Sequence, residues 1–392
     1  MPDLSDRIRS IVSDGDDGWG LYYRAREMRA AGVSVTMLSI GDHDIKTDPV
    51  ILRTMAESAE GGHLGYTPVS GLPALRQAIA DRAGRRLKTS VAPENVVICP
   101  GGQGAIFSAM TAVLNPGDAC IVLDPFYATF DVTVRAAAAE PIIVPTRADL
   151  GFQPDPDRIA AAITPRTRAI LVNSPNNPSG AVYARDRLEA IADLCRRHDL
   201  WAISDELYDG QIHSGEHVSL RDLPDMCERT IVIGSMSKGY AMTGSRVGWA
   251  IAPAVAAGLM IDLAGATTYG LPGFIQDAAV YALTECAHLE AEVAERYKRR
   301  RDIAVAAAGK SNSLSVVPPD GGMYVMLNVR GTGLSGSDFG ARLLEEEHIA
   351  VMPGESFGSA AAGHVRIALT VPDDQLGDAM TRIAQFADRI SA

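Results

Sequence analysis

The sequence predicts an α/β protein with a doubly wound, mostly parallel sheet and a smaller α+β domain formed by its N- and C-terminal segments. Short strands composed almost entirely of Val, Ile and Leu alternate with helical stretches. Strands without polar alternation are typical of parallel sheets that helices cover on both faces. After two adjacent glycines, Gly321 and Gly322, strands and helices alternate again over a shorter stretch. This second pattern predicts the smaller domain.

The N-terminal region predicts a helix over residues 19–31, a short strand over 33–40 and a turn at 41–44. A helix around Leu75 follows. The apolar runs that predict the strands of the sheet lie at 95–99, 119–123, 141–144, 168–172, 200–203, 230–233 and 247–251, with helices predicted at 105–114 and 185–198.

A long helical pattern over residues 274–309 leaves this sheet. The elements predicted beyond it are strands at 323–329, 349–352 and 364–369 and helices at 337–347 and 373–390. We therefore expect a large α/β domain over 51–290, with residues 1–50 and 291–392 contributing the smaller domain.

Composition favours an ordinary soluble globular protein over a nucleic-acid or membrane protein. The 392 residues carry a net charge of −12, and 47% of them are hydrophobic. The one dense cationic run, 298–301, lies in a charged helical pattern typical of a solvated face. The five cysteines are widely separated, and no signal-peptide pattern is evident, so we expect a reducing, cytoplasmic setting.

The strongest functional signal comes from two segments that follow apolar runs. Ser-Asp-Glu-Leu-Tyr at 204–208 and Ser-Met-Ser-Lys-Gly at 235–239 each lie just beyond a predicted strand. Ligands of open α/β sheets bind at the carboxyl ends of the strands. A lysine at that edge, here Lys238, near a carboxylate such as Asp205, favours a covalent anchor for an aldehyde cofactor.

Two other predicted strands also end in candidate ligand-binding turns. Gly101-Gly102-Gln103-Gly104 separates a strand from a helix, where free N–H groups suit a phosphate, although a plain tight turn fits equally well. Phe107 stands where a dinucleotide fingerprint needs glycine. In the turn 173–180, the proline after Asn177 restricts it to an extended conformation, which aims its amide. Tyr127 fits either a core aromatic or a stacking partner for a planar ring.

In their order and spacing, these motifs resemble the class I/II pyridoxal-phosphate aminotransferases of fold type I. Arg246, eight residues beyond Lys238, belongs to the same pattern, and the resemblance extends from Gly41 to Arg366. The resemblance implies that Lys238 forms the Schiff base with pyridoxal 5′-phosphate and moves the substrate proton. It implies that the Asp205 carboxylate bonds the pyridine nitrogen of the cofactor and keeps it protonated.

The resemblance also implies contacts around the ring and phosphate of the cofactor. Tyr208 and Asn177 would bond the ring's 3′ oxygen, and Tyr127 would stack on the ring. The groups implied to hold the phosphate are Arg246, Ser235, the Gly102 and Gln103 amides, and Tyr66 of a neighbouring subunit. A homodimer with a shared active site follows from that last contact.

For the substrates, an amino acid and a 2-oxo acid, the resemblance implies two further residues. Arg366 would bind the α-carboxylate with its planar fork. Gly41 would let the N-terminal segment close over the substrate. Where the family often has Glu-Pro after this glycine, the chain has Asp42-His43-Asp44, which could meet the substrate side chain or only cap a turn.

The leading hypothesis is an aminotransferase that moves an amino group from an L-amino acid to a 2-oxo acid by a ping-pong mechanism. A β-elimination lyase or a decarboxylase on the same scaffold stays open, because the sequence does not fix which bond at the substrate Cα is cleaved. A second arginine for a distal carboxylate is not evident, and Tyr22, His43 and Tyr269 are candidates for lining the substrate pocket. His213 and His217, four residues apart, favour a surface loop over a zinc site.

Overall fold

The computed structural model describes residues 3–11 and 19–391. Its central sheet has seven strands in the order β2–β8–β7–β6–β5–β3–β4. They are β2 (Val96–Pro100), β3 (Ala119–Asp124), β4 (Glu140–Pro145), β5 (Thr167–Asn173), β6 (Trp201–Asp205), β7 (Thr230–Ser235) and β8 (Val247–Ile251). Only β8 runs antiparallel to its two neighbours, so the predicted mostly parallel sheet is confirmed.

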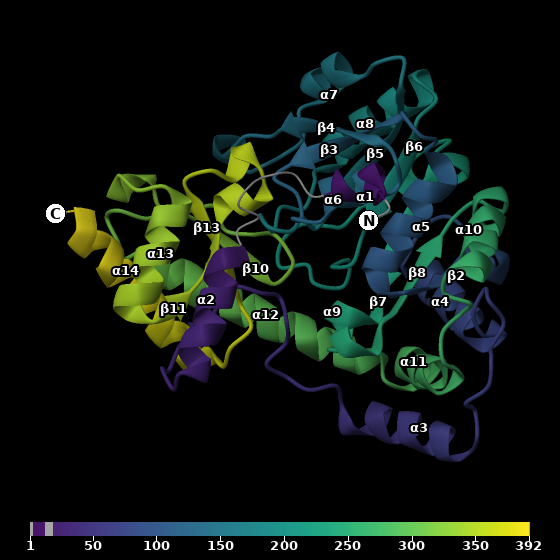
Figure 1. Ribbon diagram of the computed structural model, residues 1–392, viewed down its shortest axis with the longest axis horizontal. Helices are drawn as coiled ribbons and strands as arrows, with labels where there is room; N and C mark the ends of the chain where they lie inside the picture. The colour runs from purple at the N-terminus through teal and green to yellow at the C-terminus, as the bar shows by residue number, and fades with distance from the viewer. Residues whose placement is uncertain (1–2, 12–18, 392) are drawn as a thin grey trace.

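Helices cover both faces of this sheet, as the doubly wound prediction requires (Figure 1). On β2, Val97 and Cys99 pack on one face while Val96 and Ile98 pack on the other. The first face packs against α5 (Gly101–Val113), α6 (Phe130–Ala136) and α10 (Ala254–Ala266). The second packs against α3 (Pro49–Glu60), α4 (Pro73–Arg86), α7 (Pro156–Ala162), α8 (Arg185–Arg197) and α11 (Gly273–Glu285).

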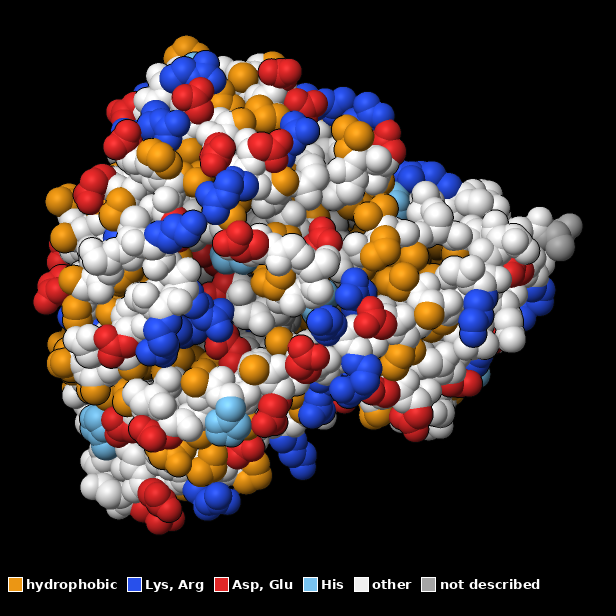
Figure 2. Space-filling model, turned by 180° about the vertical axis from the view of Figure 1, so that it is seen from behind, with side chains coloured by type: hydrophobic (Ala, Val, Ile, Leu, Met, Phe, Trp, Pro, Cys, Tyr) orange, Lys and Arg blue, Asp and Glu red, His pale blue; other side chains and the backbone are white. Residues whose placement is uncertain are grey.

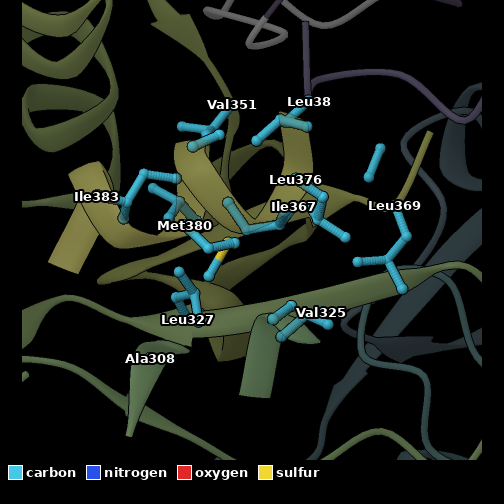
Figure 3. Packing of buried hydrophobic residues seen from close by; sticks show 14 of the residues in the cluster. Leu38, Ala308, Val325, Leu327, Val351, Ile367, Leu369, Leu376, Met380 and Ile383 are labelled. Carbon is cyan, nitrogen blue, oxygen red and sulfur yellow. The ribbon is translucent and has the colours of Figure 1, made fainter. Parts of the chain in front are cut away.

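A second, antiparallel sheet has the strand order β12–β13–β10–β9. Its strands are β9 (Ser315–Val316), β10 (Tyr324–Asn328), β12 (Met352–Pro353) and β13 (His364–Ala368), and the helices beside it are α12 (Ala287–Ala308), α13 (Gly336–Glu347) and α14 (Asp373–Ser391). Leu327, Ile367 and Met380 meet in its buried core (Figure 3). This part is the predicted smaller α+β unit.

The N-terminal segment joins this smaller unit rather than the central sheet. Leu38 is buried in the same core, and β1 (Thr36–Met37) pairs in parallel with β11 (Ile349–Ala350) (Figure 3). In Figure 1, α2 (Trp19–Ala30) lies beside α13 and β11, although most of the chain separates them in sequence. The segment limits at residues 50 and 290 stay predictions.

Several predicted elements differ in extent from the observed ones. The strand predicted over 33–40 is wrong in length, because only two residues pair with β11. The strand predicted over 349–352 is two short strands in different sheets. The helical pattern over 274–309 breaks at Cys286, whose backbone is not helical. The helix predicted from Ala105 begins at Gly101, which brings the glycine turn into its first turn.

Acidic and basic side chains are interspersed over the face that Figure 2 shows. None of the helices in residues 3–11 and 19–391 combines the length and apolarity needed to cross a bilayer. Over the same residues, no cluster of three or more His, Cys, Asp or Glu side chains suits a metal ion; His217 instead contacts the Glu206 carboxylate.

Candidate active site

A cavity of about 450 Å³ opens at the carboxyl edge of the central sheet, between it and the smaller unit. That volume suits a small-molecule site. The cavity brings together ten of the twelve residues that the sequence predicted for the site. They are Gly41, Gly102, Gln103, Tyr127, Asn177, Asp205, Tyr208, Lys238, Arg246 and Arg366.

Lys238 reaches the cavity from the short helix α9 (Met236–Gly239), which follows β7 directly. The side chain of Ser235 caps this helix by accepting a hydrogen bond from the Ser237 N–H. The Lys238 Nζ donates to the Gly41 carbonyl at 2.6 Å, so a lysine from the large sheet meets the N-terminal segment. A primary amine is thus held at the cavity wall with a single fixed partner among the described residues.

Asp205 is the last residue of β6, and 5% of its surface is exposed. Burial raises the pKa of Asp205 to about 7; the Glu206 charge adds to this and the bond from the Leu207 N–H opposes it. A buried carboxylate without a cationic partner is costly, so the cavity favours a ligand that brings a positive group to this oxygen.

A candidate anion site lies at the start of α5. Gly101 has a φ of +77°, and a Cβ there would overlap the Arg246 guanidinium, so only glycine leaves room for it. Arg246 donates to the Thr243 and Pro100 carbonyls at 2.9 and 3.3 Å and faces the cavity. Helix N–H groups and an arginine fork together suit a phosphate. The Gln103 side chain itself is bound within the protein, to Thr133.

Arg366 enters the cavity from the middle of β13 and is almost fully buried. It donates to Asn177 Oδ1 at 2.8 Å and to the Ser39 carbonyl at 2.6 Å. Its guanidinium lies between the rings of Tyr324 and Phe357, 4.2 and 4.4 Å from their centroids. Among the described residues, the Arg366 Nε has no hydrogen-bond partner. The guanidinium is therefore held in place while one of its N–H donors is still available to a ligand.

Tyr324 is a cavity residue that the sequence analysis missed. Its hydroxyl lies 3.4 Å from that of Tyr208. Burial alone raises the pKa of Tyr324, but the nearby Lys238 and Arg366 cations outweigh burial and lower it. The pair of glycines before β10 and the predicted strand at 323–329 indicated only secondary structure near Tyr324, not a role in ligand binding.

The cavity contains further residues that the sequence did not single out as ligands. They are Trp19, Ile40, Ile106, Leu207, Ser237, Thr243 and Gly244. Asp42, for which the sequence indicated a possible contact with the substrate side chain, also lines the cavity. Ser237 and Thr243 could have been found, because they lie within five residues of Lys238 in sequence. Trp19 and Ile40 could not, because only the fold brings the N-terminal segment here.

Some predicted residues lie outside the cavity lining. Ser235 is buried behind α9, where its hydroxyl donates to the Val247 carbonyl at 3.0 Å. Tyr66 is 90% exposed and its ring meets that of Tyr269, away from the cavity. Tyr22 and His43 line a neighbouring cavity that shares Ile40 and Asp42 with the first. The roles of these residues stay predictions.

Comparison with known proteins identifies the family. A model of the family described as aminotransferase class I and II matches residues 33–383. The chain is 44% identical over 384 residues to arginine–pyruvate transaminase of Pseudomonas aeruginosa, covering 98% of each protein. It is 36% identical over 392 residues to aspartate/prephenate aminotransferase of Thermus thermophilus, covering 99% of this chain and 100% of that one.

Solved structures agree with this relationship. A single mutant of Thermus thermophilus aspartate aminotransferase superimposes with a TM-score of 0.92 at 35% identity, covering 98% of this chain and 100% of that chain. The central sheet therefore has the fold type I architecture. Taken with the match over most of the sequence, this shows that the chain belongs to the class I and II aminotransferases and is a transferase enzyme that moves amino groups between amino acids and oxo acids.

Proposed function

We propose that this aminotransferase uses pyridoxal 5′-phosphate, held in the cavity at the carboxyl edge of the central sheet. The observation that carries the proposal is the buried Asp205 carboxylate, with its raised pKa, in the same cavity as Lys238 and the anion site of Arg246. A protonated ring nitrogen would supply the cation that Asp205 lacks. The phosphate would fit the first turn of α5, and the Tyr127 ring, at the cavity wall, would cover one face of the cofactor ring.

Pyridoxal phosphate, when bound, supplies an aldehyde that takes up an amine and a ring that accepts electrons from a bond at the substrate Cα. Lys238 is the amine that would anchor it. Once a substrate amine replaces it, Lys238 Nζ would be free to take a proton from the substrate Cα and to deliver it to the cofactor carbon that bore the aldehyde. The Gly41 carbonyl, 2.6 Å from Nζ, would orient this amine, and Asp205 would hold the protonated ring nitrogen of the cofactor, whose positive charge makes the Cα proton acidic.

The substrate carboxylate would bind to Arg366. Its guanidinium is already fixed by Asn177, Ser39 and two aromatic rings, so little entropy is lost when the carboxylate arrives. Tyr208 and Tyr324, with hydroxyls 3.4 Å apart, offer donors beside the reacting amine. The same residues would serve the amino acid and then the 2-oxo acid, because the first product leaves before the second substrate binds, which is a ping-pong sequence.

The charges of the cavity favour a donor with a cationic side chain over one with a distal carboxylate. Both cavity arginines are assigned above, to the phosphate and the α-carboxylate, and the additional acidic residue at its wall is Asp42. The relative from Pseudomonas aeruginosa is named for arginine and pyruvate. We therefore propose that arginine or lysine is a better donor than aspartate, with a small 2-oxo acid as the acceptor.

The assembly and compartment of the enzyme are also proposals. An exposed pair of aromatic rings, Tyr66 and Tyr269, with 90% and 57% of their surfaces exposed, favours a covered interface in a homodimer. Light scattering should then give twice the chain mass of 41.5 kDa. All five cysteines are free, and four are buried, which favours a reducing, cytoplasmic setting.

One experiment tests the cofactor and its anchor together. Holoprotein is reduced with borohydride, digested and analysed by mass spectrometry; the cofactor mass should appear on the peptide that carries Lys238. The Lys238→Ala variant should lose turnover by about 10⁴-fold or more, since the general base disappears. Lys310→Ala, which removes an exposed lysine outside the cavity, should behave like the wild type. Cofactor on another peptide would overturn the assignment.

A second measurement separates transamination from its rivals. Enzyme and cofactor are incubated with a panel of amino acids, including arginine, lysine, leucine and aspartate, with and without pyruvate. Transfer of the amino group should require the acceptor. Release of pyruvate and ammonia without an acceptor would instead identify a β-elimination lyase, and release of carbon dioxide a decarboxylase. Equal rates with arginine and aspartate would contradict the proposed preference for a cationic donor.

A further inference from the structure

Residues 41–48 form a segment, here called the strap, that crosses the turn carrying Lys238. The sequence left the role of Asp42-His43-Asp44 open. The strap is bound to residues 237–243 by four contacts: Lys238 Nζ to the Gly41 carbonyl at 2.6 Å, Thr243 Oγ1 to Asp42 Oδ1 at 2.9 Å, His43 Nε2 to the Ser237 carbonyl at 3.0 Å, and Thr47 Oγ1 to the Ala241 carbonyl at 2.7 Å.

His43 differs from the other strap residues because both of its ring nitrogens are engaged. Nε2 contacts the carbonyl of the peptide group that joins Ser237 to Lys238. Nδ1 contacts the hydroxyl of Tyr297 on α12 at 2.7 Å, and Tyr297 is fully buried. The imidazole therefore connects α12, a helix of the smaller unit, to the peptide bond immediately before Lys238.

The direction of both hydrogen bonds follows from the charge of the ring. Burial, with the nearby Lys238 cation, lowers the pKa of His43 to about 4, so the ring is neutral near pH 7 and carries one N–H. The Ser237 carbonyl can only accept, so this hydrogen is on Nε2. Nδ1 then accepts from the Tyr297 hydroxyl, and the chain of donors runs from Tyr297 through His43 to Ser237.

The next strap residue fixes the strap to the same helix. Asp44 accepts two hydrogen bonds from the Arg300 guanidinium, at 2.8 and 2.7 Å. Arg300 is buried and also binds Asp373 at the start of α14. Tyr297 and Arg300 lie one turn apart on α12, so two consecutive strap residues, His43 and Asp44, are held by one rigid element.

We propose that His43 is a positioning residue for Lys238: it fixes the peptide plane from which the lysine side chain starts, using α12 as its support. The proposal rests on the proposed role of Lys238 as cofactor anchor and proton carrier. His43 does not line the cavity, so it acts through Lys238 rather than on the substrate. A reacting group displaced by about 1 Å can lose about 100-fold in rate, which makes such support consequential.

Four variants of the holoenzyme test the proposal. His43→Phe removes both hydrogen bonds and keeps a planar ring. His43→Gln keeps an N–H near the Nε2 position. Tyr297→Phe removes only the hydroxyl that supports Nδ1. Thr47→Val is the matched control, because it removes a strap bond to a carbonyl of the same loop, three residues beyond Lys238.

We expect kcat of His43→Phe to fall about 10- to 100-fold while KM for the amino donor changes less than about twofold, because Arg366 and Asn177 are untouched. His43→Gln should recover most of the lost kcat. Tyr297→Phe should lose several-fold, about what one neutral hydrogen bond is worth. Thr47→Val should stay within about twofold of the wild type in both constants.

A second readout uses the protein without cofactor. Acetic anhydride modifies free amines, and mass spectrometry compares Lys238 with Lys310, an exposed lysine far along the chain. In His43→Phe the bond from Nζ to Gly41 is less well held, so Lys238 should react about threefold faster relative to Lys310. His43→Gln and Thr47→Val should match the wild type. This readout holds whether or not borohydride attaches the cofactor to Lys238, so the two proposals can fail separately.

Three outcomes would overturn the proposal: equal losses of kcat in His43→Phe and Thr47→Val, no recovery in His43→Gln, or unchanged Lys238 labelling in His43→Phe. If His43→Phe does not fold, the other variants decide. Wild-type kcat in Tyr297→Phe, or a His43→Gln enzyme that has lost about 10-fold or more in kcat while Thr47→Val has not, would then refute it. A loss of thermal stability alone, with kcat unchanged, would make His43 a structural residue only.

Discussion

The carboxyl edge of the central sheet and the strap both hold Lys238, but in different ways. At the sheet edge, Asp205 and Lys238 follow neighbouring strands, β6 and β7, whose backbones are paired along their lengths. The strap has no regular secondary structure, and individual bonds such as those of His43 and Asp44 hold it in place. The sheet edge therefore brings the Asp205 carboxylate and the Lys238 amine together, whereas the proposed role of the strap is to fix the orientation of the Lys238 side chain.

Among changes that leave Lys238 in place, the largest effect is expected where the two regions share one residue, Arg366, which binds Asn177 of the sheet edge and the Ser39 carbonyl just before the strap. Arg366→Lys keeps the charge but loses the fork that makes both bonds. We expect kcat/KM for the amino donor to fall about 100-fold or more, since removing one partner of a buried charged bond costs about 2–5 kcal/mol. Steady-state kinetics measures this loss.

A matched control for this prediction is Arg342→Lys, on α13, which exchanges an arginine that forms an exposed pair with Glu346. It should leave kcat/KM unchanged, because such pairs contribute little. Arg366→Lys with near wild-type kinetics would mean that the carboxylate binds elsewhere, and the proposed pose of the substrate would have to be abandoned.

At the sheet edge alone, Asp205→Asn should stabilise the cofactor-free protein at pH 8. Burial raises the folded-state pKa of Asp205 to about 7, above its unfolded value of about 3.9. Between these values the folded state binds more protons, so the wild type loses stability as pH rises from about 4 to 7. The asparagine variant lacks that loss and should gain about 2–4 kcal/mol at pH 8, and much less at pH 5.

Urea unfolding of both proteins at pH 5 and pH 8 measures this difference. Asp262→Asn, which changes an exposed carboxylate on α10, should show no comparable pH-dependent gain. With cofactor added, the order should reverse, because only the wild type can pair with a protonated ring. A variant that is less stable than the wild type at pH 8 without cofactor would show that Asp205 is already compensated within the protein.

On the strap side, Gly41→Ala tests the close approach of the strap to β10. A Cβ at this position would overlap the Tyr324 hydroxyl. Because overpacking costs about 1–3 kcal/mol, the strap should move away and kcat should fall about tenfold. Adding Tyr324→Phe removes the overlapping atom and should recover part of the loss when kcat of the single and double variants is compared.

Gly84→Ala is the control for that change, since a Cβ there meets nothing within 4 Å and the residue lies inside α4. It should leave kcat unchanged and add up to about 1 kcal/mol of stability, as alanine favours a helix more than glycine. If Tyr324→Phe lowers kcat of the Gly41→Ala enzyme further instead of restoring it, the clash is not the cause of the loss.

The same comparison explains how much the sequence could predict. The sheet edge was predictable because each of its residues follows an apolar strand, so Asp205, Asn177 and Lys238 could be assigned to one edge from local pattern alone. The resemblance to a family was needed for Arg366, since a strand-end arginine carries no signal of its own. The cavity then brought these residues together as expected.

The strap and Tyr324 could not be predicted, for a physical reason. The bonds of His43 reach Ser237 and Tyr297, which are about 200 and 250 residues away along the chain. Such contacts depend on how two sheets pack, and no periodicity in the sequence records that packing. Likewise, the two-residue strand β1 is set by its pairing with β11, so its apolar run alone overstated its length.

The continuity of α12 has a practical consequence for building hybrid enzymes. Its 22 residues, Ala287–Ala308, span about 33 Å without a break. They present Tyr297 and Arg300 to the strap and bury Ala304 and Ala308 in the core of the smaller unit. If the C-terminal regions of two homologues were exchanged at residue 290, the strap of one protein would contact the α12 of the other. A hybrid enzyme designed to transfer the amino-donor preference of one homologue to another should therefore take residues 41–48 and α12 from the same parent.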